Sequence, residues 1–87
     1  MNKSFFKKLT ALEPDACKTL YEKYKVLLYS ICRRYASEEG DAQDMMQEGF
    51  IAIFDSIDKY KFQGSFEGYI KRVFINSVLQ FLSLIHI

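Results

Sequence analysis

The sequence contains few of the residues that break helices and few of those that carry out catalysis. Its 87 residues include one proline and four glycines, a composition that favours helices over a turn-rich β fold. There is one histidine, there are two cysteines, and no apolar run reaches the length of a membrane span. A chain of this length forms one small domain. Nucleotide-binding and barrel architectures of roughly 150 to 250 residues are therefore excluded.

The candidate catalytic and metal-ligating residues do not form a recognisable site. His86 lies next to the end of the chain, where a solvated side chain is expected. There is no Gly-rich phosphate loop, no Cys/His ligand set and no nucleophile–base pair. Asp44 and Glu48 lie four residues apart without a histidine at ligand spacing, so a solvated acidic face is expected there. We predict a protein that is not an enzyme and that binds no metal or cofactor.

The two cysteines, Cys17 and Cys32, occupy apolar positions of one expected helix, where 15 residues separate them and prevent a disulfide. They are expected to be buried free thiols in a reducing compartment. No secretory signal is visible, because Phe5-Phe6 is followed at once by Lys7-Lys8. These features predict a cytoplasmic protein that does not bind a membrane.

The charges are grouped in three blocks although the formal net charge is only +1. Residues 1–36 carry a net charge of +5, residues 37–58 carry −7, and residues 59–87 carry +3. A basic–acidic–basic chain presents different faces to different partners. Pairing of the blocks with one another across a bundle is the alternative, and the sequence leaves both interpretations open.

Hydrophobic periodicity predicts an all-α fold, a small bundle of three main helices plus a short N-terminal helix. The short helix is expected at about Ser4–Leu12. The second helix begins at Pro14, because proline favours the first position of a helix, and it is expected to end near Gly40. Asp41 is the expected N-cap of the third helix.

The stretch Asp58–Gly64 lacks periodicity and is interpreted as a loop or a short irregular turn of helix. Ser65 is the expected cap of the last helix. The apolar face of the second helix comprises Cys17, Leu20, Tyr21, Tyr24, Leu27, Leu28, Ile31, Cys32 and Tyr35. The corresponding face of the third helix comprises Ala42, Met45, Met46, Phe50, Ile53 and Ile57. That of the last helix comprises Phe66, Tyr69, Ile70, Val73, Phe74, Ser77 and Phe81.

The opposite face of the third helix is acidic around one apolar residue. Its members are Asp44, Gln47, Glu48, Ile51 and Asp55, with Phe54 at the edge. An apolar residue ringed by acids on a face turned from the core is typical of a protein-contact surface. An ordinary solvated helix face is the alternative, since single exposed apolar residues are common.

The last third of the chain interleaves basic and aromatic side chains. These are Lys59, Tyr60, Lys61, Phe62, Phe66, Tyr69, Lys71 and Arg72, followed by Asn76. Cations that follow phosphates and rings that stack on bases are typical of proteins that bind single-stranded nucleic acid. Phe66 and Tyr69 lie on the apolar face, which favours a core role for them. For Tyr60 and Phe62 a core role and an exposed role both stay open.

Three segments of the sequence form a pattern when they are read together. The central segment is DAQDMMQEGFIAIFDSIDKY, residues 41–60, preceded by LYEKYKVLLYSICRRYAS and followed by FEGYIKRVFIN. In this order and spacing the segments resemble region 2 of bacterial RNA polymerase sigma factors of the extracytoplasmic-function type. The resemblance covers about residues 9–82, and residues 83–87 do not fit the pattern. We do not expect these residues to form the helix-turn-helix domain that reads the −35 element in the family, so the resemblance is to a fragment of a sigma factor.

The resemblance implies that the third helix docks on the coiled coil of the polymerase β′ clamp. That role falls on Asp44, Gln47 and Glu48, with Phe50 and Phe54 beside or within the contact. Ile51 joins this polymerase-binding set from the surface pattern described above. An anti-sigma factor that masks the same surfaces is a further expected partner.

The resemblance also implies that the last helix and the loop before it hold single-stranded promoter DNA of the −10 element. One base enters a pocket formed by residues 62–68, at an unstacking cost of a few kcal/mol. The expected DNA-binding residues are Lys59, Lys61, Phe62, Tyr69, Lys71, Arg72 and Asn76. Tyr69 stands where the family usually has tryptophan, and Gln80 and Ser83 stand where an acid and basic residues normally follow. The alternative function is that of a small helical adaptor that binds a protein and no nucleic acid.

Overall fold

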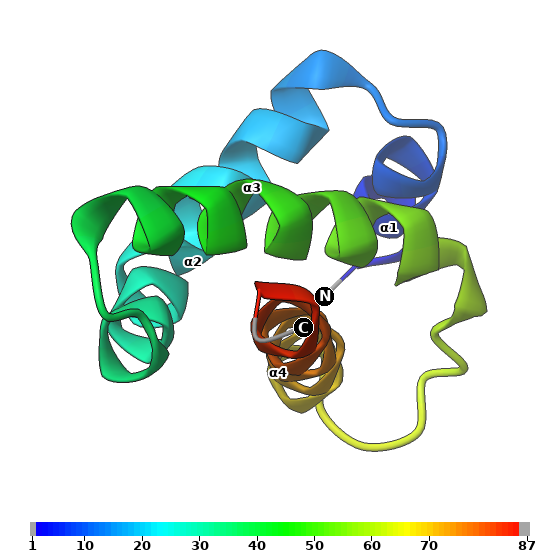
Figure 1. The fold of residues 1–87 in the computed structure, drawn as a ribbon. Coiled ribbons are helices and arrows are strands. Elements are labelled where there is room, and N and C mark those ends of the chain that lie inside the picture. The colour runs from blue at the N-terminus through cyan, green and yellow to red at the C-terminus, as the bar shows by residue number, and fades with distance from the viewer. Residues whose placement is uncertain (1, 86–87) are drawn as a thin grey trace.

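The computed structural model describes residues 2–85, with the side chain of Ile85 left out, and confirms the all-α prediction. In this range the elements are α1 (Lys3–Thr10), α2 (Pro14–Tyr35), α3 (Glu39–Ser56), the 3₁₀ turn η1 (Ile57–Lys59) and α4 (Phe66–Ile85). Figure 1 shows α3 passing in front of α2, α4 viewed nearly end-on below α3, and α1 near the C-terminal end of α3. No helix between residues 2 and 85 has the length and apolar character needed to cross a membrane.

Local sequence signals account for the start of three helices. The Asn2 side chain accepts a hydrogen bond from the backbone N–H of Phe5 at 2.7 Å and caps α1. Pro14 occupies the first turn of α2, as predicted. The Ser65 hydroxyl accepts a hydrogen bond from the N–H of Gly68 at 2.9 Å, which confirms Ser65 as the cap of α4.

The predicted boundary between the second and third helices was wrong. α2 ends at Tyr35, because Ala36 adopts an extended backbone, and α3 already begins at Glu39. The Glu39 carboxylate accepts hydrogen bonds from the Tyr29 hydroxyl and, at 3.2 Å, from the Arg33 guanidinium of α2. Asp41 therefore lies within the first turn of α3 rather than at its cap, where its charge still favours the positive end of the helix.

The predicted end of the first helix was also two residues too late. α1 ends at Thr10, and Leu12 adopts a left-handed backbone with φ of 56°. A leucine in this region cannot continue a right-handed helix. The irregular stretch after α3 agrees with its prediction, since η1 contributes a single turn and residues 60–65 form a loop.

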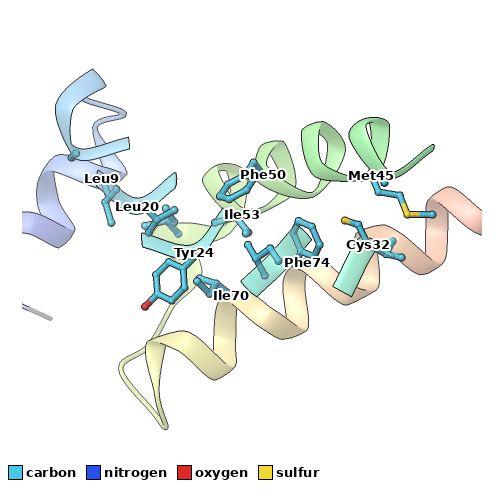
Figure 2. Close-up of a cluster of buried hydrophobic side chains, with 14 residues drawn as sticks. Leu9, Leu20, Tyr24, Cys32, Met45, Phe50, Ile53, Ile70 and Phe74 are labelled. Carbon is cyan, nitrogen blue, oxygen red and sulfur yellow. The ribbon is translucent and has the colours of Figure 1, made fainter. Parts of the chain in front are cut away.

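The core lies between α2, α3 and α4, with Leu9 contributed by α1. Figure 2 shows Phe50 and Ile53 of α3 facing Ile70 and Phe74 of α4. The buried residues of α2 form a single row with a spacing of four, namely Ala16, Leu20, Tyr24, Leu28 and Cys32. That row is narrower than the predicted apolar face.

Two predicted core residues of α2, Tyr21 and Tyr35, are exposed instead. Cys17, Leu27 and Ile31 are only half-buried. The reason is that α2 contacts α3 and α4 along one narrow row, so residues at its sides reach the surface. The exposure of these two tyrosines costs little free energy, because their phenolic hydroxyl groups can hydrogen-bond with water.

The ring of Phe74 in α4 packs closely against α3 at Gly49, a core position that periodicity did not identify. A Cβ atom at Gly49 would lie 2.9 Å from Cζ of Phe74 and closer still to its Cδ1 and Cε1 atoms. Phe74 is fully buried against this site. Glycine is therefore required here because the aromatic ring of α4 packs directly on the backbone of α3.

Both cysteines are free thiols, as predicted, but only Cys32 is fully buried. Burial raises the pKa of Cys32 from its ordinary value of 9.0 to about 11, and it also raises the pKa of the half-buried Cys17. A buried thiol resists ionisation because the thiolate loses its hydration.

Raising the pH from 9 to 11 is expected to destabilise the fold through Cys32. In that window the folded state keeps the Cys32 proton and the unfolded state loses it, so stability falls as pH rises. The expected loss is about 2 to 3 kcal/mol. Urea denaturation measures the free energy of unfolding of the chain and of Cys32→Ala from pH 8 to about 11. The difference between the two pH dependences isolates the contribution of the Cys32 thiol, since both proteins contain all the other titrating groups. Parallel curves for the two proteins contradict the prediction.

Candidate functional site

The outer face of α3 carries the acidic surface that the sequence predicted. Its five residues, Asp44, Gln47, Glu48, Ile51 and Asp55, are all exposed in the structure. Ile51 has an exposed fraction of 49%, although an isoleucine gains free energy by burial. The opposite face of α3 buries Ala42, Met45, Phe50 and Ile53 in the core.

An apolar groove of about 750 Å³ lies between this face of α3 and the exposed side of α2. Gln47, Ile51 and the half-buried Phe54 of the predicted polymerase-binding set line it, and so does the buried Phe50, which was expected beside or within the contact. Asp44 and Glu48 lie on the same exposed face but do not line the groove. The structure therefore gives an apolar groove with an acidic border on its α3 side.

The α2 wall of the groove was missed by the sequence analysis. It includes Tyr21, Val26 and Tyr29. The Tyr21 ring packs on Phe50 with the ring centroids 4.8 Å apart. Val26 is 76% exposed. Its position outside the predicted apolar face of α2 is the sequence signal that could have indicated this second apolar surface.

Tyr29 connects the groove to the start of α3. Its hydroxyl donates to Glu39, and this hydrogen bond raises the pKa of Tyr29, while the nearby Arg33 opposes the shift. The carboxylate of Glu39 also pairs with Arg33 at 3.2 Å. One end of the groove is therefore held by polar contacts between α2 and α3.

A second surface is built around Tyr60, in the loop between η1 and α4. Tyr60 is only 8% exposed, and its ring lies within 6.3 Å of four other rings, those of Phe6, Phe62, Phe66 and Tyr69. Its hydroxyl donates to the carbonyl oxygen of Gly64 at 2.7 Å. We call these five residues the aromatic cluster. It gives Tyr60 a core role, one of the two alternatives left open by the sequence.

Phe62 has the exposed role, the other alternative left open by the sequence, because 50% of its surface is accessible to solvent. Its backbone adopts the left-handed region with φ of 59°, which is costly for a residue with a bulky side chain. The ring contacts Phe6 at 4.8 Å and Tyr60 at 4.9 Å, centroid to centroid. One side of Phe62 is therefore packed and the other side is free to contact a ligand.

The polar residues of the predicted DNA-binding set lie around this cluster and along α4. Lys59, Lys61, Arg72 and Asn76 are exposed, and Lys71 is half-buried. Arg72 and Asn76 are one turn apart, so they share one side of α4. Lys71 pairs with Glu67 at 3.4 Å, an exposed ion pair that adds little stability.

Tyr69 connects the aromatic cluster to α3. It is half-buried, so its position on the predicted apolar face and its predicted place in the DNA-binding set are compatible. Its hydroxyl donates to the carbonyl oxygen of Ser56 at 2.6 Å. Ser56 is the last residue of α3, where carbonyl groups have no partner within the helix.

Comparison with known proteins places residues 20–83 within a family model described as Sigma-70 region 2. The ECF RNA polymerase sigma factor SigE of Mycolicibacterium smegmatis is 36% identical over 52 residues, which are 60% of this chain and 20% of that protein. This chain therefore spans a fifth of the length of that relative.

A solved structure shares the fold. It is the NMR structure of the complex formed by an engineered region 2 of sigmaE with GTAAAA. The two chains are 21% identical, with a TM-score of 0.78, and the match covers 97% of this chain and 93% of the other.

Proposed function

We propose that this chain, which belongs to the Sigma-70 region 2 family, binds the RNA polymerase core and recognises and melts the promoter −10 element in transcription initiation. The family membership agrees with the resemblance found in the sequence. The observation that carries the proposal is the presence of two unlike surfaces on different elements. One is the acid-bordered groove of α2 and α3, and the other is the aromatic cluster with the basic residues beside it.

The groove suits a protein partner that offers an apolar ridge with basic neighbours. An apolar centre with a polar border is the usual anatomy of a protein interface. The carboxylates of Asp44, Glu48 and Asp55 attract positive charge and orient the partner. In this proposal the partner is the clamp coiled coil of the β′ subunit, and an anti-sigma factor covers the same groove when it is present.

Asp44→Ala and Gln47→Ala are each expected to weaken binding to core polymerase by about 1 to 3 kcal/mol, the range for a central interface contact. Biolayer interferometry with immobilised core enzyme measures the change. Glu13→Ala is the matched control, since Glu13 is an exposed carboxylate near α1 whose side chain makes no capping hydrogen bond. Unchanged affinity for both α3 variants contradicts the assignment of this face.

The aromatic cluster suits single-stranded DNA. The free side of Phe62 offers a ring for base stacking, and Lys59, Lys61 and Arg72 offer positive charge to phosphates. The structural neighbour was solved with GTAAAA, a ligand of the same chemistry. The chain itself has no catalytic part in this scheme, because the polymerase performs the chemistry. Its place of action is the cytoplasm.

The double variant Lys71→Gln/Arg72→Gln is expected to weaken capture of a single strand and to leave polymerase binding unchanged. Each lost phosphate contact reduces the slope of log K against log salt by about 0.7. Fluorescence anisotropy with a labelled strand that contains GTAAAA, with and without core polymerase, measures both effects.

The control for this variant is Lys8→Gln/Lys18→Gln, which removes the same charge from exposed positions of α1 and α2. Equal slopes for the two double variants contradict the role of Lys71 and Arg72. A chain that binds polymerase but no strand, even in the presence of polymerase, is the helical adaptor instead.

A further inference from the structure

The N-terminal helix α1 lies outside residues 20–83, the range matched by the family model, yet it is attached to the proposed DNA surface. The Phe6 ring lies 4.8 Å from Phe62 and 6.3 Å from Tyr60, centroid to centroid, in edge-to-face geometry. Such aromatic pairs stabilise one relative orientation of the rings. α1 therefore forms one wall of the aromatic cluster.

Phe62 depends on this wall more than an ordinary loop residue would. Its left-handed backbone is unfavourable by itself and persists only where the surroundings fix it. Only Phe6 and Tyr60 form ring contacts with it among residues 2–85. Loss of the Phe6 ring removes one of these two contacts, so that Tyr60 alone then fixes the direction of the exposed side of Phe62.

Two lysines of α1 lie beside Phe6. Around the helix axis Lys3 lies about 60° from Phe6 and about 40° from Lys7, so Lys3 is a neighbour of both. Lys7 itself lies about 100° from Phe6, at the edge of the same side of the helix. Both lysines are exposed, and neither forms an ion pair with another side chain between residues 2 and 85. Lys8 lies about 200° around the helix from Phe6, on the other side.

We propose that α1 completes the surface that binds single-stranded DNA. Phe6 is a positioning residue that holds the Phe62 ring for stacking on a base, and Lys3 and Lys7 contact the backbone phosphates next to that base. This inference rests on the proposed function, because it assigns α1 to the same ligand.

The first arm of the test removes the two charges. Lys3→Gln/Lys7→Gln is titrated with a fluorescein-labelled strand containing GTAAAA between about 0.05 and 0.3 M salt. The slope of log K against log salt is expected to become shallower by about 1.4, which corresponds to about fivefold in affinity per lysine at 0.1 M salt. Lys8→Gln/Lys18→Gln carries the same charge change away from Phe6 and is expected to keep its slope. Equal slopes for the two double variants overturn the phosphate contact.

The second arm is a double-variant cycle between Phe6 and Phe62. Phe6→Leu is expected to weaken strand binding by about threefold to tenfold, part of the value of one base–aromatic stack. In a Phe62→Ala background the same change is expected to have no further effect. Phe6→Tyr retains the ring and is expected to bind like the unaltered chain. An equal loss from Phe6→Leu in both backgrounds, or a tenfold loss from Phe6→Tyr, overturns the positioning role.

The same titration separates this inference from the proposed function. If Lys71→Gln/Arg72→Gln flattens the salt dependence and the α1 variants do not, the role of α1 is wrong and the function stands. If the unaltered chain binds no strand with or without core polymerase, both are overturned. If Phe6→Leu fails to fold, as judged by circular dichroism, Phe6→Tyr and the lysine arm decide the outcome.

Discussion

Gly49→Ala is expected to lower the free energy of unfolding by about 2 to 3 kcal/mol, although alanine is the better helix former. The new methyl group meets the ring of the fully buried Phe74, and α3 and α4 must separate to admit it. Overpacking of a filled core typically costs about 1 to 3 kcal/mol, and the overlap of the new carbon with three ring atoms of Phe74 places this site at or above the upper end of that range, about 3 to 4 kcal/mol. The gain of about 1 kcal/mol in helix propensity offsets part of this cost. In a domain of this size the melting temperature is expected to fall by about 10 to 20 °C.

Gly40→Ala is the matched control, because it makes the same substitution in the first turn of the same helix. A Cβ atom at Gly40 meets nothing within 4 Å. Thermal unfolding followed by circular dichroism is expected to show an unchanged or slightly raised melting temperature for this variant. If the two variants behave alike, the close approach of α3 and α4 at Gly49 is wrong.

Tyr60→Ala is expected to cost about 3 to 5 kcal/mol of stability, the range for a large buried aromatic residue. The ring lies at the centre of the aromatic cluster, so its removal leaves four neighbouring rings without their common partner. The loop of residues 60–65 loses the ring and the hydroxyl group by which Tyr60 holds it, and binding of single-stranded DNA is expected to fall with it. Urea denaturation measures the first effect and fluorescence anisotropy the second.

Tyr60→Phe separates the hydrogen bond from the ring. It removes only the donation from the Tyr60 hydroxyl to the carbonyl oxygen of Gly64, which is worth about 1 kcal/mol. The variant is expected to keep the fold and most of the affinity for a strand. A loss as large as that of Tyr60→Ala contradicts the central role of the ring.

The helices were predictable because each has a local signal in the sequence. Pro14 and Ser65 mark two helix starts, and the spacing of apolar residues marks the buried sides. The start of α3 was not predictable, since it is fixed by the contact of Glu39 with Tyr29 and Arg33 of another helix. Gly49 was missed for the same reason: its role depends on the ring of Phe74, 25 residues away in the sequence.

The acidic face of α3 was predictable from periodicity alone, since all of its residues are exposed as expected. The groove beside it was not, because Tyr21 fits the apolar pattern of α2 and its exposure depends on where α3 crosses. The left-handed backbone of Phe62 also has no local signal, as glycine or asparagine usually occupies such a position.

The hydrogen bond from Tyr69 to the end of α3 requires a tyrosine at this position, where the resemblance leads us to expect tryptophan. A phenol places its donor at the far tip of the ring, where it reaches the Ser56 carbonyl oxygen at 2.6 Å. The ring is thereby tethered at both ends, by its own backbone and by α3. In the proposed function, a tethered ring loses little rotational freedom when a base stacks on it, and this preorganisation favours binding.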